Sequence, residues 1–589
     1  MLDIFLNLIE YQFVTCIGLI VFYHLGLFIN YLVPIFQIGN FNFVILGLVF
    51  SIIACWYSFI FFGNTSYTIF AIMFVSLLTF LLNFNHNRRF IRIDLQKHFV
   101  LFIIANLAYL PALLILIKSN VHDGAITLFN ADIGSYSQSA SQMLHNKWTF
   151  FDLTRYDSQI INDSSGAVIF VTFFSTIFEF RNGLGLTSAI IGANWILVYS
   201  LINFLKSLFS RSNLPQNYFY VASLLTTLFS LNVYITGNFF IAQIIGMSAV
   251  LGLLSVCFQY LKSEISVRVF LVQSIIWFLL GLYTYAHLAV LLIVLILIIL
   301  IYKKSFALVS RIDFIRIICI VLIVLPQILV AFKLALFRLN VDAGWPLPGL
   351  NYFNLFFNYF DFRNNYYFFP AAQQFIFISV CLLFLFYVTS LLFKNDKNYV
   401  YTSLLLLVIS VLFIHLFLDI ISYKGWKLFS SILLILIPIL VVLALSAAQK
   451  KFMLGYVVLF LFAQSLNSPF VLWRDMIIDP FNVNSGFPRL TRSELFEIPD
   501  LLNSLENERL STTSKINIDL GDYLETMIID SMLFEYKTKL VSKSYNDSAS
   551  FNDTCTLSTK NNVKYLSSVQ VNLNEYYSIY LNPAKCNFN

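Results

Sequence analysis

Charge is scarce in this chain. Only 11% of its 589 residues are Asp, Glu, Lys or Arg, whereas soluble proteins contain roughly 25% of them, and 59% of the residues are hydrophobic. This composition excludes a water-soluble globular protein. The net charge of +6 is spread over short segments and does not indicate nucleic-acid binding. Apolar and polar residues do not alternate over stretches of about ten positions, which excludes a transmembrane β-barrel.

A basic signal-peptide region is also missing. The chain begins Met1-Leu2-Asp3 and continues into an apolar stretch of span length, so we expect no cleavable signal peptide. Cysteines are few, and five of the seven lie singly in apolar segments, where we expect them in the core. Cys555 and Cys586 lie in polar sequence, where they either pair in an oxidising compartment or stay reduced.

Long apolar runs are what the chain does contain. Examples are Phe99–Ile117, Phe314–Phe332 and Leu428–Leu445, each close to the roughly 20 residues that cross a bilayer as a helix. The pattern predicts a polytopic α-helical membrane protein with about fourteen transmembrane helices. We expect them at 10–34, 41–62, 67–84, 99–118, 184–204, 217–235, 239–260, 268–284, 287–302, 314–336, 373–393, 400–418, 428–446 and 452–469.

The basic residues predict how these spans are oriented. They gather in six clusters, which begin at Arg88, Lys206, Lys262, Lys303, Lys394 and Lys450. With fourteen spans, all six clusters fall on one side, which the positive-inside rule makes cytoplasmic. We therefore expect an integral protein of a bacterial inner membrane whose N-terminus, polar loop and C-terminal domain are extracytoplasmic.

The composition divides the chain into four parts. Residues 1–118 form a four-span block, 119–183 an extracytoplasmic loop with interfacial helices, and 184–469 a ten-span membrane core. Residues 470–589 are polar and predict a small extracytoplasmic α/β domain. Its strands are expected at 515–520, 539–542, 563–571 and 576–581.

The polar segment Ser119–Ser165 holds the main candidates for chemistry, because carboxylates near a bilayer are costly to desolvate. Asp132, Tyr136, Ala140 and Leu144 recur every four residues and would share one face of a helix. The helix dipole favours a carboxylate at the helix start, where Asp132 can accept a proton or bind a divalent cation. The alternative is a capping Asp on a surface helix.

This pattern resembles the first external loop of GT-C glycosyltransferases, which are polytopic enzymes that take a sugar from a polyprenyl-phosphate carrier. Gly237–Gln243, Tyr283–His287 and Tyr423–Lys427 are similar to segments of bacterial GT-C-like proteins with extra N-terminal spans. The resemblance implies a GT-C-like fold, with Asp132 as the catalytic base. It implies three partners: membrane lipid, a polyprenyl-phosphate-linked sugar donor, and a glycan or lipid acceptor.

The chain also departs from that family. Four spans precede the loop where the family usually has one, and the Pro-rich start of the following segment is replaced by Ser164-Ser165-Gly166. Asp123, next to His122, is the rival catalytic carboxylate, and this pair would orient a substrate hydroxyl or a metal. His-Asp-Gly is also an ordinary polar turn. A divalent metal is compatible with the sequence but not required by it.

Further candidates would bind substrate. Lys424 and Lys427 lie at the predicted outer mouth of a span and would pair with the donor phosphate, although lysines at helix ends also snorkel to the interface. His287, Gln243 and Trp345 would line a sugar or lipid site; each also suits packing or the bilayer interface.

The sequence thus predicts a membrane glycosyltransferase that acts at the outer leaflet in assembly of a cell-envelope glycan or glycolipid. One alternative is a transporter or lipid flippase, although the chain has no repeated half and no paired broken helices. The other is a polymerase or ligase of lipid-linked polysaccharide.

Overall fold

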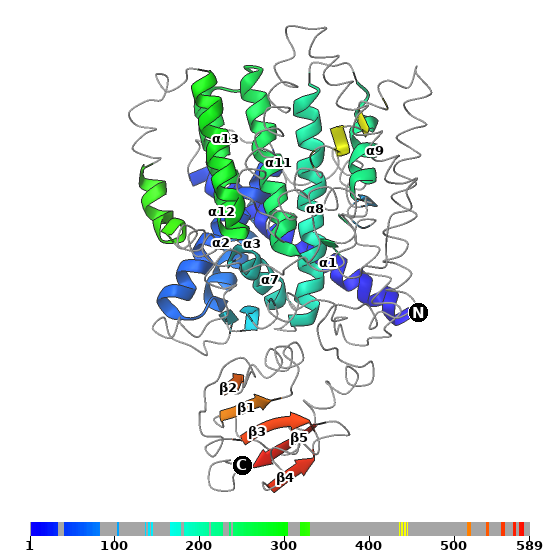
Figure 1. Ribbon diagram of the computed structural model, residues 1–589, viewed down its shortest axis with the longest axis vertical. Coiled ribbons are helices and arrows are strands. Elements are labelled where there is room, and N and C mark those ends of the chain that lie inside the picture. The colour runs from blue at the N-terminus through cyan, green and yellow to red at the C-terminus, as the bar shows by residue number, and fades with distance from the viewer. Residues whose placement is uncertain are drawn as a thin grey trace, which may run out of the picture.

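The computed structural model describes residues 2–32, 40–82, 165–177, 182–210, 214–227, 240–303 and 318–329, strands between 515 and 581, and single residues within 103–106, 136–144, 232–236 and 435–445. The helices form a bundle, and the strands form a sheet that lies apart from it (Figure 1).

Five helices are long and apolar enough to cross a membrane, and they confirm five of the expected spans. They are α1 (Leu2–Leu32), α2 (Asn40–Phe62), α8 (Asn182–Leu208), α11 (Ile241–Leu261) and α12 (Val267–Thr284). The chain is therefore a helical membrane protein.

Shorter apolar helices occupy further expected spans. They are α3 (Ser66–Leu82), α13 (Ala289–Tyr302) and the helical stretch Ile318–Leu329. In the expected span 217–235, α9 (Gln216–Thr227) is followed by single helical residues. The expected spans 373–393, 400–418 and 452–469 lie outside the described residues.

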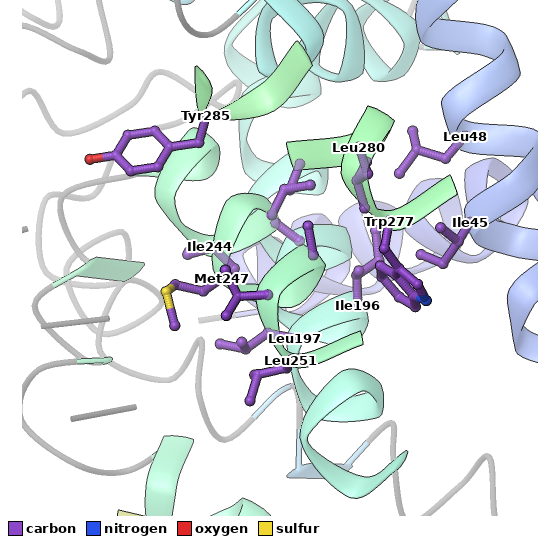
Figure 2. Close-up of a cluster of buried hydrophobic side chains, with 14 of the residues drawn as sticks. Ile45, Leu48, Ile196, Leu197, Ile244, Met247, Leu251, Trp277, Leu280 and Tyr285 are labelled. Carbon is purple, nitrogen blue, oxygen red and sulfur yellow. The ribbon is translucent and has the colours of Figure 1, made fainter. Parts of the chain in front are cut away.

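Helix α11 is the centre of the bundle and packs against α8 and α12 (Figure 1). Its residues 241–258 are all buried, which is typical of a core helix that is apolar on every side. Figure 2 shows apolar side chains from α2, α8, α11 and α12 converging on this core. Gly252 makes room for the Trp277 ring, because a Cβ there would lie 2.3 Å from Trp277 Cε2.

Helices α1 and α2 cross at a pair of glycines. A Cβ on Gly26 would lie 1.9 Å from the backbone oxygen of Phe43, and a Cβ on Gly47 would lie 1.8 Å from that of Phe22. Each helix thus places a glycine against the backbone of the other. Small residues allow such close approach between membrane helices, where packing rather than hydrophobicity drives association.

The outward faces of α3 and α13 are apolar. On α13, Ile293, Leu297 and Ile301 recur every four residues and are 42% to 64% exposed. On α3, Phe70 and Phe74 form a similar exposed stripe. Contiguous apolar faces of this kind mark contact with lipid or another apolar partner, as expected of membrane helices.

The bundle has two chemically different ends. At one end, which we call the lysine end, Lys206 lies in the last turn of α8, Lys262 follows α11 and Lys303 follows α13. Lys262 Nζ donates to the backbone oxygens of Ser207 and Leu208 at 2.6 and 2.8 Å and so joins α11 to α8. Three of the six basic clusters therefore begin at one end, although the side of the membrane on which that end lies stays a prediction.

Helix α7 (Ser165–Ile177) lies in the part of the chain, 119–183, where interfacial helices were expected. It is enclosed by other helices, and all its residues from Ser165 to Thr176 are buried. Phe173 and Phe174 pack against Phe22 of α1, with ring centroids 4.6 and 6.5 Å away. The helix thus inserts its aromatic residues into the bundle; its depth in a bilayer stays a prediction.

The C-terminal strands form one mixed sheet of order β2-β1-β3-β5-β4. The strands are β1 (Lys515–Asp519), β2 (Lys537–Leu540), β3 (Cys555–Thr559), β4 (Val569–Asn572) and β5 (Tyr577–Leu581). Strand β1 runs parallel to β2 and β3, whereas β5 pairs antiparallel with β3 and β4. The expected strands 515–520, 539–542 and 576–581 match β1, β2 and β5 within about two residues, but the central strand β3 had not been expected.

Candidate functional site

Part of the polar loop is helical and packed into the protein. Tyr136, Ser139, Ala140, Ser141, Met143 and Leu144 are all helical, and none of them is more than 3% exposed. We call these six residues the loop helix; Tyr136 is its first described residue and Leu144 its last. Tyr136, Ala140 and Leu144, which the four-residue spacing placed on one helical face, are therefore buried in contact with the bundle rather than on a solvated surface.

One end of the loop helix is bound by the turn between α2 and α3. The backbone oxygen of Met143 accepts from the backbone N–H of Thr65 at 3.0 Å and from Thr65 Oγ1 at 3.1 Å. The backbone oxygen of Leu144 accepts from Asn64 Nδ2 at 2.8 Å and from Ser66 Oγ at 3.1 Å. The donors to these two carbonyls thus come from a segment about 80 residues away in sequence.

The other end of the loop helix meets the start of α11. Tyr136 Oη accepts a hydrogen bond from the backbone N–H of Ala242 at 3.3 Å. The residue before α11 is Phe240, whose side chain cannot cap the helix, so the N–H groups of the first turn need acceptors from elsewhere. The phenol oxygen of Tyr136 fills that role.

Two segments that carry the family resemblance, the ones containing Gln243 and Tyr285, meet at the first turns of α11. Gln243 follows Ala242 directly and is 1% exposed, so its amide faces protein rather than lipid. One turn later, Gly246 accommodates Tyr285, because a Cβ on Gly246 would lie 2.6 Å from Tyr285 Cβ. Figure 2 shows the Tyr285 ring pointing away from Trp277 and Leu280, and the residue is buried, with 6% of it exposed.

The start of α7 closes this group of segments. Ser165 Oγ donates to the backbone oxygen of Tyr283 at 3.4 Å. A Cβ on Gly166 would lie 3.0 Å from the same backbone oxygen. Thr172, two turns into α7, places its hydroxyl 3.8 Å from Met143 Sδ. The loop helix, α7, the end of α12 and the start of α11 are therefore in contact at one end of the bundle, which we call the loop end.

The loop end contrasts with the lysine end. Helix α11 runs from its first turn at the loop end to Lys262 at the lysine end, and α12 returns to Tyr283. The described part of the loop end is built from hydroxyls, amides and aromatic rings, together with the positive end of the α11 dipole.

The structure describes only some of the predicted site residues. Tyr136 and Gln243 are brought together through Ala242, and His287 lies in the short 3-10 helix Ala286–Leu288. The side chain of His287 is not described. The remaining predicted site residues are Asp132, Asp123, His122, Lys424, Lys427 and Trp345, and they lie outside the described residues.

Metal binding has no support among the residues that the structure describes, since no three His, Cys, Asp or Glu side chains lie together there. Asn64, Thr65 and Ser66 fall between two expected spans and were not among the predicted site residues. Three consecutive polar residues in so short a link were the available signal.

The chain matches no known protein family, and no curated protein is significantly similar to it.

Proposed function

We propose that the protein is a membrane glycosyltransferase of the GT-C type, with its active site at the loop end. The observation that supports this most is the hydrogen bond between Tyr136 and Ala242. It joins the polar loop, the segment ending in Gln243 and, through Gly246, the segment containing Tyr285. These segments are far apart in sequence, and all of them carry the resemblance to that class of enzyme.

The proposed reaction is a single displacement. Asp132, expected one helical turn before Tyr136, accepts the proton of the acceptor hydroxyl. The hydroxyl oxygen then bonds to the anomeric carbon of the donor sugar. The bond from that carbon to the phosphate oxygen breaks, and polyprenyl phosphate leaves with the electron pair. Such a displacement inverts the anomeric centre.

The remaining predicted residues have supporting roles in this proposal. Lys424 and Lys427 offset the charge on the departing phosphate. Tyr136 and Gln243 bound the site near the start of α11, where the helix dipole also favours an anion. Asp123 and His122 form the alternative catalytic pair, and Trp345 and His287 contact the sugar. The sheet belongs to an extracytoplasmic α/β domain, and the lysine end faces the cytoplasm.

The test is release of polyprenyl phosphate from a synthetic polyprenyl-phosphate hexose by the purified protein, with water or an added glycan hydroxyl as the acceptor of the hexose. Wild-type protein and Glu264→Gln, a change at the exposed lysine end, are expected to release it equally. Asp132→Asn is expected to lose on the order of a hundredfold or more in rate, because it removes a general base. Equal rates for Asp132→Asn, with normal folding, would reject the mechanism.

The same assay separates the alternatives. A flippase or transporter would move the lipid-linked sugar across vesicles without breaking the bond between sugar and phosphate. A polymerase or ligase would act on a saccharide that is already assembled, and would leave the monosaccharide donor intact. If either of these results is seen and the monosaccharide donor is neither hydrolysed nor used for transfer, the corresponding alternative replaces the proposed function.

A further inference from the structure

We infer that the turn between α2 and α3 is a positioning element for the loop helix, and that this is one function of the N-terminal spans. The turn donates four hydrogen bonds to two backbone oxygens, those of Met143 and Leu144. Its donors come from three consecutive residues, Asn64, Thr65 and Ser66. The role in catalysis rests on the proposed function, whereas the positioning itself does not.

The turn is itself held in a defined shape by α2. Gly63 has φ 69°, a left-handed conformation that suits glycine, and its N–H donates to the backbone oxygen of Phe59 at 2.8 Å. Ser58 Oγ donates to the backbone oxygen of Asn64 at 2.8 Å. Asn64 Oδ1 accepts from the backbone N–H of Ser66 at 2.7 Å and so caps the start of α3. These bonds within the turn hold its donors in the orientation that reaches the loop helix.

The loop helix is fixed at two points. At its first described residue, Tyr136 meets the start of α11, and at its last, Leu144 meets the turn. Contact at one end alone would leave the helix free to pivot. Contact at both points sets the position and the rotation of the loop helix. Because Asp132 precedes Tyr136 by only four residues in the sequence, we expect a change at either point to displace Asp132 as well.

Asn64 offers a substitution that separates docking from capping. In Asn64→Asp, one carboxylate oxygen still accepts from the N–H of Ser66, and Asp is as good a helix cap as Asn. The other oxygen replaces the amide donor and faces the backbone oxygen of Leu144, so two acceptors oppose each other. Thr65→Val is the milder second variant, because it removes only the Oγ1 donor and keeps the backbone N–H.

The matched control is Ser51→Ala. Ser51 lies in α2, the helix that leads into the turn, is buried, and donates its hydroxyl within that helix to the backbone oxygen of Gly47 at 2.8 Å. Removing this hydroxyl changes α2 without touching the loop helix. Any effect common to Ser51→Ala and Asn64→Asp therefore comes from α2 itself.

The measurement is hydrogen exchange of peptides covering residues 136–144 in the full-length protein in nanodiscs. Asn64→Asp is expected to speed their exchange about tenfold and Thr65→Val about threefold, since local opening follows the loss of hydrogen bonds. Ser51→Ala should match wild type. If Asn64→Asp and Thr65→Val both exchange at the wild-type rate, the turn does not position the loop helix.

Turnover of the polyprenyl-phosphate hexose then separates this inference from the proposed function. If both hold, Asn64→Asp lowers the rate of transfer and leaves the KM for the donor nearly unchanged, because binding groups elsewhere are intact. If Asn64→Asp exchanges faster but the wild-type protein shows no transfer activity, the proposed function is rejected and the positioning role is kept. If Asp132→Asn loses transfer but Asn64→Asp and Thr65→Val exchange at the wild-type rate, the proposed function is kept and the positioning role is rejected.

Discussion

The phenol oxygen of Tyr136 accepts the backbone N–H of Ala242 across 106 residues of sequence. A loop residue thereby caps the central helix of the bundle, whose own preceding residue, Phe240, has no side chain able to do so. The loop helix and the first turn of α11 therefore depend on each other. Loosening the loop is expected to fray α11 next to Gln243.

Tyr136→Phe tests this dependence. The substitution keeps the ring in its buried site and removes only the oxygen that accepts from Ala242. We expect the free energy of unfolding to fall by about 1 kcal/mol, and hydrogen exchange to rise in the first turn of α11 more than in its last turn. The measurement is an unfolding titration in mixed micelles together with exchange mass spectrometry.

Tyr67→Phe is the control for that experiment, because Tyr67 lies at the start of α3 and its side chain is 83% exposed. It should unfold and exchange like the wild type. A Tyr136→Phe protein indistinguishable from Tyr67→Phe in α11 exchange would mean that the hydrogen bond contributes nothing to the helix start.

The glycines where α1 and α2 cross support a second prediction. Gly26→Ala or Gly47→Ala would place a methyl carbon within 2 Å of a backbone oxygen, which cannot rotate away as a side chain can. We expect each to lower the free energy of unfolding by roughly 3 kcal/mol or to prevent folding. Gly192→Ala is the matched control: its nearest neighbour is a Phe170 ring atom at 3.2 Å, and a smaller loss is expected. Equal losses at all three sites would contradict the crossing geometry.

Much of the helical fold was predictable because each long apolar run has to satisfy its own backbone as a helix. Which helices pack against one another was not predictable. The contacts of Gly26 with Phe43 and of Gly166 with Tyr283 depend on the shapes of the two surfaces rather than on a local sequence pattern. Strand β3 was missed for a similar reason. Its sequence Cys555–Thr559 is short and mostly polar, and its place between β1 and β5 makes it a strand.

The candidate site was predictable in part. The four-residue spacing placed Tyr136, Ala140 and Leu144 on one helical face but did not predict that they are buried, whereas a glutamine inside an apolar run indicated that Gln243 faces protein. The three consecutive polar residues Asn64, Thr65 and Ser66 indicate only that this link differs from its apolar surroundings. Their partners could not be derived, because they are backbone oxygens, which carry no sequence signal. The same holds for the N–H of Ala242.

The two ends of the bundle allow a direct test of orientation. Tyr67, beside the turn that binds the loop helix, and Glu264, beside Lys262, are both exposed. In a cysteine-free background, Tyr67→Cys should react with a membrane-impermeant maleimide added to intact spheroplasts. Glu264→Cys should react only after the membrane is opened, because the lysine end is expected on the cytoplasmic side. The reverse labelling pattern would place the loop end in the cytoplasm and would exclude a polyprenyl-linked donor used at the outer leaflet.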